Sequence, residues 1–164
     1  MTATTTDLFA LAVLAAALAA AAIGDVRRYL IPNRYPAAIA AAYLLAALQH
    51  PIDQTLWGIG VGLLSFALGA ALFAARVMGG GDVKLFAATA LWAGPQLALP
   101  FVQVVAIAGA ALGLLWLSPV RRLLPAAPGL DGDQGFRQRL REPVPYGLAI
   151  AIGGFYLVSI RALA

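Results

Sequence analysis

Two aspartates lie beside glycines at points where apolar runs are interrupted. Asp25 follows Gly24 at the end of the first apolar run, and Asp82 follows three consecutive glycines, Gly79–Gly81. Only seven of the 164 residues are acidic, so carboxyl groups are scarce in this chain. Two facing carboxyl groups that share one proton can cleave a peptide bond, because the charged one activates water while the neutral one protonates the carbonyl oxygen or the leaving amine. The pair is therefore a candidate catalytic dyad that needs no metal, cysteine or serine.

Each aspartate also has a plainer interpretation. Asp82 is placed to cap a helix N-terminus, and Asp25 is placed to pair with Arg27 or Arg28. The glycines have a use of their own, since consecutive glycines let another backbone approach closely, such as that of an extended peptide substrate. The joint pattern favours chemistry, because both carboxyls adjoin helix-breaking residues in a chain with few acids.

The composition excludes an ordinary soluble domain. Hydrophobic residues make up 62% of the chain and charged residues 11%, whereas soluble domains are about 45–50% apolar and about 25% charged. Such a chain has more apolar surface than a water-soluble fold can bury, so we expect an all-α polytopic membrane protein. The chain has no cysteine, and its one histidine, His50, has no cluster of ligand partners. No metal site and no cofactor are therefore expected.

Charge-free stretches define the expected membrane spans. A membrane helix needs about 20 predominantly apolar residues, and all but one of these stretches fit a single helix. The exception, 85–120, is too long for one span and contains Gly94-Pro95-Gln96, which is typical of a turn. The sequence therefore predicts six transmembrane helices, at 8–24, 36–50, 55–76, 83–94, 97–117 and 144–161.

The basic residues predict the orientation in the membrane. With six crossings, the connections after the first, third and fifth helices share one side, and this side carries all the Lys and Arg residues except Arg161. The positive-inside rule places this side in the cytoplasm and both termini outside it. Asp25 and Asp82 then meet at the cytoplasmic face, and no nucleic-acid partner is expected. The basic residues on this side are Arg27, Arg28, Arg34, Arg76, Lys84, Arg121, Arg122, Arg137, Arg139 and Arg141.

Small and aromatic residues indicate how the helices pack. Gly58-x-x-x-Gly62 and Gly109-x-x-x-Gly113 each place small residues on one helical face, where two backbones can approach closely. The three tryptophans fall near expected helix ends, where anchoring in the lipid interface is typical; they are Trp57, Trp92 and Trp116.

The segments around the two aspartates resemble those of a known family. The chain is similar to the type IV prepilin peptidases, aspartic membrane peptidases with a GxGD motif, and in particular to the short form that serves Flp pili. The resemblance covers essentially the whole chain, 1–164, as a single membrane-embedded peptidase domain. It rests on Asp25 with Ile31-Pro32-Asn33, on Gly79-Gly80-Gly81-Asp82-Val83-Lys84, and on Pro145-Tyr146-Gly147.

The resemblance implies that Asp25 and Asp82 are the catalytic pair, at the cytoplasmic face of the bacterial inner membrane. The implied substrate is a prepilin, cut after a glycine between its basic leader and its apolar N-terminal helix, and membrane lipid is the other expected partner. For the Lys84 side chain, neutralising the carboxylates and snorkelling are both open. Five residues match the motifs without an assigned chemical step and would shape the site or substrate access: Gly79, Gly81, Lys84, Pro32 and Asn33.

Two expectations concern the connections between helices. Longer members of the family carry a cytoplasmic region with paired cysteines that methylates the new N-terminus, and nothing in this chain corresponds to it. Peptidase activity without methyl transfer is therefore expected. The longest connection, Ser118–Glu142, is rich in Pro, Gly and Arg; we expect a plain connector, with a mobile lid over the site as the alternative.

Three other functions stay open from the sequence. A small transporter or proton channel would usually have ionisable groups near the membrane midplane or repeated halves, and the sequence has neither. A structural membrane subunit would tolerate replacement of both aspartates. A GxGD protease of the signal-peptide-peptidase type would cut within membrane helices, but Ile31-Pro32-Asn33 and Pro145-Tyr146-Gly147 favour the prepilin branch.

Overall fold

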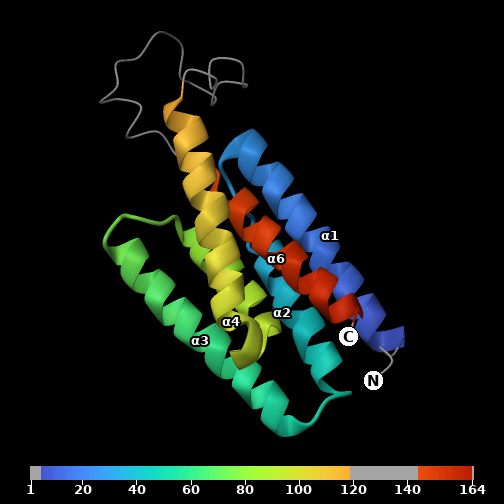
Figure 1. Ribbon diagram of the computed structural model, residues 1–164. Helices are drawn as coiled ribbons and strands as arrows, with labels where there is room; N and C mark the ends of the chain where they lie inside the picture. Colours follow the sequence, from blue (N-terminus) through green and yellow to red (C-terminus); the bar gives the residue numbers. More distant parts are fainter. Residues whose placement is uncertain (1–4, 119–143, 164) are drawn as a thin grey trace.

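The computed structural model describes residues 5–118 and 144–163, and every regular element in these ranges is a helix. The all-α expectation is therefore confirmed for this part of the chain. The helices form one elongated bundle (Figure 1). They are α1 (Thr5–Arg28), α2 (Arg34–Ala47), α3 (Ile52–Ala74), α4 (Gly80–Leu117) and α6 (Tyr146–Leu163).

The expected number of six transmembrane helices is wrong. The described residues form five helices, of which four are long and apolar enough to cross a membrane. The helix that falls short is α2, whose 14 residues extend about 21 Å against a hydrocarbon core of about 30 Å. In addition, the expected fourth and fifth helices form one element, α4. They are joined without a loop, because inside α4 only Gly94 departs from helical backbone angles (φ 57°, ψ −175°).

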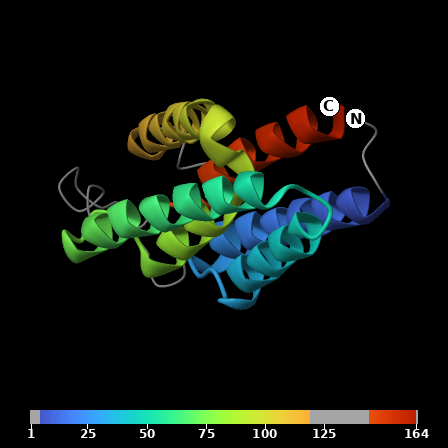
Figure 2. The same cartoon turned by 90° about the horizontal axis from the view of Figure 1, so that it is seen from below.

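The kink at Gly94 reverses the direction of α4. A straight helix would separate Phe86 from Phe101 by about 22 Å, yet their rings stack with centroids 5.2 Å apart. Figures 1 and 2 show the second half of α4 running back toward the end at which the first half starts. Pro95 reinforces the break, because it has no N–H to donate to the preceding turn. The predicted turn at Gly94-Pro95-Gln96 is thus present as a kink.

Four of the helices close into a ring. On one side α1 packs against α2 and α6, and on the other side α4 packs against the same two helices. The two helices that carry Asp25 and Asp82 are therefore both bridged by α2 and by α6. The remaining helix, α3, packs on α4. The centre of the ring is apolar and fully buried, at Leu14, Leu18, Ile39, Leu85, Phe101, Ile150 and Leu157.

In α3 the positions of small and large side chains are the reverse of those in a helix of a soluble protein. Its buried residues are small, namely Gly58, Gly62, Ser65 and Gly69, and they form one stripe along α3. Its large leucines and phenylalanines face outward instead, and Leu63, for example, is 65% exposed. Small residues at the helix contact and large apolar residues outside are typical of a helix surrounded by lipid. The exposed surface of α3 therefore supports a membrane location.

The two predicted small-residue pairs differ in their packing. A Cβ atom added at Gly58 would lie 2.8 Å from the carbonyl oxygen of Leu91, and one at Gly62 would collide with the Leu91 side chain. The close helix approach expected at this pair is confirmed. In the second pair, a Cβ added at Gly109 would make only ordinary contacts with α6, and one added at Gly113 would meet no atom within 4 Å. Among the described residues, the second pair forms no tight helix contact.

The expectation that all three tryptophans anchor in lipid is wrong for Trp92. This side chain is 3% exposed, its Nε1 donates to the carbonyl oxygen of Ile39 at 3.2 Å, and its ring meets Tyr43 edge-on. The indole is buried because α2 offers it both an acceptor and an aromatic partner. Trp57 is 64% exposed, as a lipid anchor should be. The side chain of Trp116 lies outside the part that the structure describes.

The break in α4 is stabilised from α6. Where a helix breaks, the carbonyl groups of the preceding turn lose their partners within the helix. Here Arg161 donates its Nε to the carbonyl oxygen of Trp92 at 2.7 Å. The lost helical hydrogen bond beside Gly94 is thus replaced by a charged donor from another helix.

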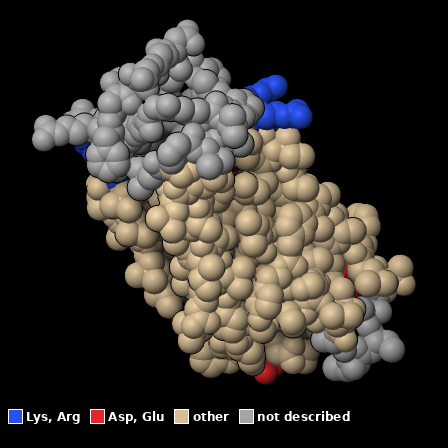
Figure 3. All heavy atoms as spheres, turned by 45° about the horizontal axis from the view of Figure 1, so that its top comes forward, with Lys and Arg blue, Asp and Glu red and all other residues tan. Residues whose placement is uncertain are grey.

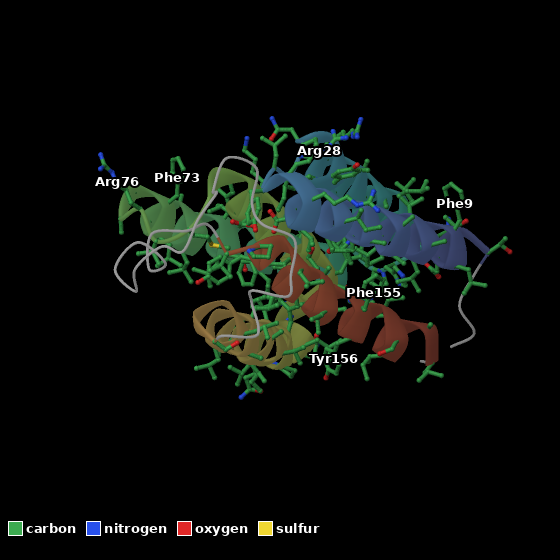
Figure 4. All side chains as sticks on the ribbon, turned by 90° about the horizontal axis from the view of Figure 1, so that it is seen from above. Phe9, Arg28, Phe73, Arg76, Phe155 and Tyr156 are labelled. Carbon is green, nitrogen blue, oxygen red and sulfur yellow. The ribbon has the colours of Figure 1, made fainter. Side chains whose placement is uncertain are left out.

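Charged side chains gather at the ends of the bundle. Figure 3 shows lysine and arginine side chains at one end and a broad face without charge beside them. At this end Arg28 closes α1 and Arg76 follows α3, and Figure 4 shows both side chains pointing away from the bundle. At the other end, His50 Nε2 lies 3.2 Å from Asp7 Oδ1. The uncharged band between the two ends fits the interior of a membrane.

A matched pair of substitutions in α3 tests the glycine contact. We predict that Gly58→Ala lowers the free energy of unfolding by about 1–3 kcal/mol, since its Cβ would crowd Leu91 and the Tyr43 hydroxyl. Gly60→Ala has open space and is expected to be neutral or stabilising by up to about 1 kcal/mol. Thermal unfolding in detergent measures both, and equal stability of the two variants would contradict the close packing of α3 on α4.

Candidate active site

Asp25 lies in the last turn of α1 and is 6% exposed. The helix ends three residues later, where Tyr29 adopts a φ of 52°, a left-handed conformation that side chains with a Cβ rarely adopt. The chain then turns back over Gly24, where an added Cβ would lie 3.4 Å from the Leu30 carbonyl oxygen. This reversal brings the next residue, Ile31, to the level of the Asp25 carboxyl.

Asp82 lies in the first turn of α4, and Gly79 occupies the capping position before it. Asp82 is therefore not the residue that caps this helix. The backbone of Gly79 hydrogen-bonds its carboxyl, and a Cβ added at Gly79 would lie 2.7 Å from Oδ2. The other oxygen, Oδ1, is buried without a hydrogen-bond partner among the described residues. An unpaired buried polar atom costs about 1–3 kcal/mol, and a catalytic role or a bound water is among the reasons for which a native structure keeps one.

Ile31 packs against the first turns of α4 and α6, beside the two carboxyls. A Cβ added at Gly81 would lie 3.1 Å from the Cβ of Ile31, and one added at Gly147 would lie 2.8 Å from its Cδ1. The side chain is 8% exposed. Ile31 thus occupies the space over Gly81 in which we expected a substrate backbone. The absence of a side chain at Gly81 allows this contact with Ile31.

Asn33 and Lys84 form a second link between the same segments. Asn33 stands at the N-terminus of α2 without capping it, and its Oδ1 accepts a hydrogen bond from Lys84 Nζ at 2.9 Å. The half-buried Pro32 connects Ile31 to Asn33, and its carbonyl oxygen accepts the N–H of Tyr35 at 3.1 Å. The structure gives Lys84 a use beyond the two that the sequence left open, since it ties the start of α4 to the start of α2.

The last helix reaches the site with its N-terminus. The backbone N–H of Gly147 donates to Asp25 Oδ2 at 2.7 Å, in a buried hydrogen bond. Arg27 and Arg28, the partners considered for this aspartate, are exposed, and no ion pair joins them to Asp25 in the described part of the chain. A backbone donor therefore holds the carboxyl in place of a cation.

The structure brings the sequence-predicted residues together at one end of the bundle. The two carboxyls interact electrostatically, and the remaining residues surround them through the contacts of Ile31, Lys84 and Gly79. Residues 5–118 and 144–163 contain no cluster of three His, Cys, Asp or Glu side chains that could hold a metal ion. The connection 119–142, considered as a lid, lies outside the described residues. The residues brought together are Asp25, Asp82, Gly79, Gly81, Lys84, Pro32 and Asn33.

Two site residues had no role assigned from the sequence. Gly147 acts through its backbone N–H, a group that nearly every residue has. Its residue type therefore does not indicate this role. Ile31 acts by shape, and an isoleucine in an apolar chain carries no signal of its own. One feature of the sequence does point to Gly147: a glycine follows Pro145-Tyr146, and a glycine at the start of a helix permits another group to approach its backbone closely.

Comparisons with known proteins show the family of the chain. The sequence profile of the type IV leader peptidase family matches residues 12–114, which include both Asp25 and Asp82. The chain belongs to the type IV leader peptidase family. This membership agrees with the resemblance that the motifs indicated.

A curated relative carries the same family's name. The prepilin leader peptidase/N-methyltransferase of Xanthomonas campestris pv. campestris is 29% identical to this type IV leader peptidase family member over 138 residues. The match covers 80% of this chain and 42% of the relative, so the chain spans less than half of the relative's length. No solved structure matches the chain.

A thermodynamic cycle tests the link between α2 and α4 in this family member. We predict that Lys84→Met and Asn33→Ala each lower the free energy of unfolding, and that the double variant loses about 0.5–1 kcal/mol less than the sum, because the singles remove the same hydrogen bond. Arg76→Met is the control for removing a positive charge at this end. Strict additivity of the two substitutions would contradict the link.

Proposed function

We propose that the chain is an aspartic endopeptidase that removes the leader peptide from prepilins of the Flp type, with Asp25 and Asp82 as its catalytic dyad. The observation that supports this most is the meeting of two carboxyls at one end of the bundle, where Asp25 is buried and one oxygen of the half-buried Asp82 has no hydrogen-bond partner among the described residues. Family membership supports the peptidase activity and the prepilin substrate.

The proposed reaction uses one proton shared by the two carboxyls. One carboxylate takes a proton from water, whose oxygen attacks the scissile carbonyl carbon, while the other carboxyl gives its proton to the carbonyl oxygen. The tetrahedral intermediate then collapses: the carboxyl that took the proton from water gives it to the leaving amine, the C–N bond breaks, and the former carbonyl oxygen returns its proton to the other carboxylate. The unpaired Oδ1 of Asp82 is the oxygen available to water or to the substrate carbonyl, because the described residues offer it no hydrogen bond.

The depth of the site fits a bond at the boundary between leader and pilin helix. Asp25 stands about one helical turn inside the end of α1 at Arg28, which corresponds to about 5 Å. Asp82 stands about 18 Å along α4 from the kink at Gly94. The carboxyls therefore lie slightly inside the basic end of the bundle, where an apolar pilin helix leaves the membrane and a polar leader begins.

The dyad is tested by replacing each carboxyl with its isosteric amide. We predict that Asp25→Asn and Asp82→Asn each reduce leader removal by about 10³-fold or more, since neither amide can exchange the required proton. Cells that express a prepilin together with each variant report processing as a shift in the size of the pilin. Asp53→Asn is the matched control, because this carboxyl lies in the first turn of α3 and is exposed.

The other outcomes are equally informative. Full processing by either amide variant excludes the dyad mechanism. Cleavage of a membrane helix within its apolar segment, with the prepilin left intact, indicates the signal-peptide-peptidase type of activity. Substrate-linked ion or solute flux in liposomes without any cleavage indicates a transporter.

The proposed cytoplasmic location of the site has a test of its own. The chain has no cysteine, so single cysteines can be labelled without background. We predict that an impermeant thiol reagent added to right-side-out membrane vesicles labels Leu48→Cys, which is 78% exposed at the end of α2, and spares Arg76→Cys at the basic end until the membrane is permeabilised. Labelling of Arg76→Cys in sealed vesicles would place the site on the outer face.

A further inference from the structure

We propose that Gly147 is a positioning residue for Asp25, and that its backbone N–H, in the first turn of α6, fixes the orientation of the carboxyl for the reaction. The proposal rests on the proposed function. It assigns a role to α6, which lies beyond the residues 12–114 that match the family profile. Gly147 acts through Asp25, so it is a positioning residue rather than a catalytic one.

The hydrogen bond satisfies both of its partners. Gly147 is the second residue of α6, and the N–H groups of the first helical turn have no partner within the helix. Pro145, which precedes α6, has no side-chain oxygen to cap it. Asp25 supplies the missing acceptor from α1, at 2.7 Å, and a carboxylate suits the positive end of a helix.

The space around Gly147 is filled by the carboxyl that it holds. A Cβ at this position would lie 2.8 Å from Asp25 Oδ2, 3.1 Å from the Cβ of Asp25 and 2.8 Å from Ile31 Cδ1. These separations are shorter than normal van der Waals contacts, so a side chain would push either the carboxyl or Ile31 aside. The glycine is therefore required by the presence of Asp25 and not only by helix packing.

The same helix also sets the spacing between α1 and α4. It packs against both, and Gly154, about two turns beyond Gly147, lies between them. A Cβ added at Gly154 would collide with Leu18 of α1 and lie 3.1 Å from Thr89 Cγ2 of α4. With α6 held against both helices, its first turn delivers the Gly147 N–H to a fixed place. A displacement of about 1 Å at a reacting group can cost about 100-fold in rate.

A set of alanine variants separates positioning from packing. Gly147→Ala crowds Asp25, whereas Gly153→Ala crowds Val105 and Phe101 of α4 without touching Asp25, and Gly113→Ala meets open space. We expect Gly147→Ala to lower kcat for a leader-bearing prepilin by about 30- to 100-fold, with KM changed by less than about threefold. Gly153→Ala is expected to unfold at a lower temperature and to keep kcat within about threefold of wild type.

A compensating substitution sharpens the result. Ile31→Val removes the Cδ1 atom that the methyl group of Gly147→Ala would meet, but it leaves Asp25 in place. If Gly147 positions the carboxyl, Gly147→Ala combined with Ile31→Val keeps the low kcat, compared with Ile31→Val alone as its control. Recovery of kcat in the double variant would assign the loss to crowding of Ile31 and overturn the proposal.

A stability measurement tests the hydrogen bond even if Gly147→Ala fails to fold. Asparagine at position 25 can still accept the Gly147 N–H, and alanine cannot. We expect Asp25→Asn to unfold near the wild-type temperature and Asp25→Ala to unfold about 2–4 °C lower. Equal unfolding temperatures for the two Asp25 variants would overturn the proposal.

Failure of this proposal and failure of the proposed function give different results. If Gly147→Ala keeps the wild-type kcat while both amide variants of the dyad are inactive, the positioning role is wrong and the dyad stands. If Asp25→Asn retains full activity, the proposed function is wrong, whatever the result for Gly147.

Discussion

A carboxyl group inside a bundle that faces lipid must find its polar partners within the protein, because the hydrocarbon offers none. Asp25 and Asp82 meet this requirement with backbone groups of two glycines, Gly147 and Gly79. A Cβ at either glycine would lie within 2.8 Å of a carboxyl oxygen, so only a residue without a side chain brings its backbone so near. The glycines around the site therefore serve as points of contact.

The two ends of the bundle use polar groups in different ways. At the end away from the site, Arg161 occupies the carbonyl group freed by the kink in α4, and His50 pairs with Asp7. The Arg161 contact replaces a hydrogen bond lost at the kink and joins α6 to α4. At the site, one carboxyl oxygen of Asp82 is kept buried and unpaired within the described chain.

The location of Asp25 and Asp82 at one end could be predicted from the sequence, because the two expected helices between them, 36–50 and 55–76, return the chain to the end at which the first helix finishes. The number of membrane spans could not, since the turn at Gly94 is so tight that two expected helices become one element and α2 is too short to span. Trp92 was misplaced because its burial depends on a carbonyl group of Ile39, 53 positions away. The role of Gly147 could not be predicted for the same reason. Every residue except proline has a backbone N–H, and only the fold shows which acceptor this one reaches.

A structure of the protein with a prepilin peptide in which a tetrahedral hydroxyl group replaces the scissile carbonyl would show whether the two carboxyls act together. If Asp25 and Asp82 form one dyad, this hydroxyl lies within hydrogen-bonding distance of both, at about 2.6–3.2 Å, with Gly147 still donating to Asp25. A peptide bound with its hydroxyl beside only one of the carboxyls, or beside neither, would contradict the dyad.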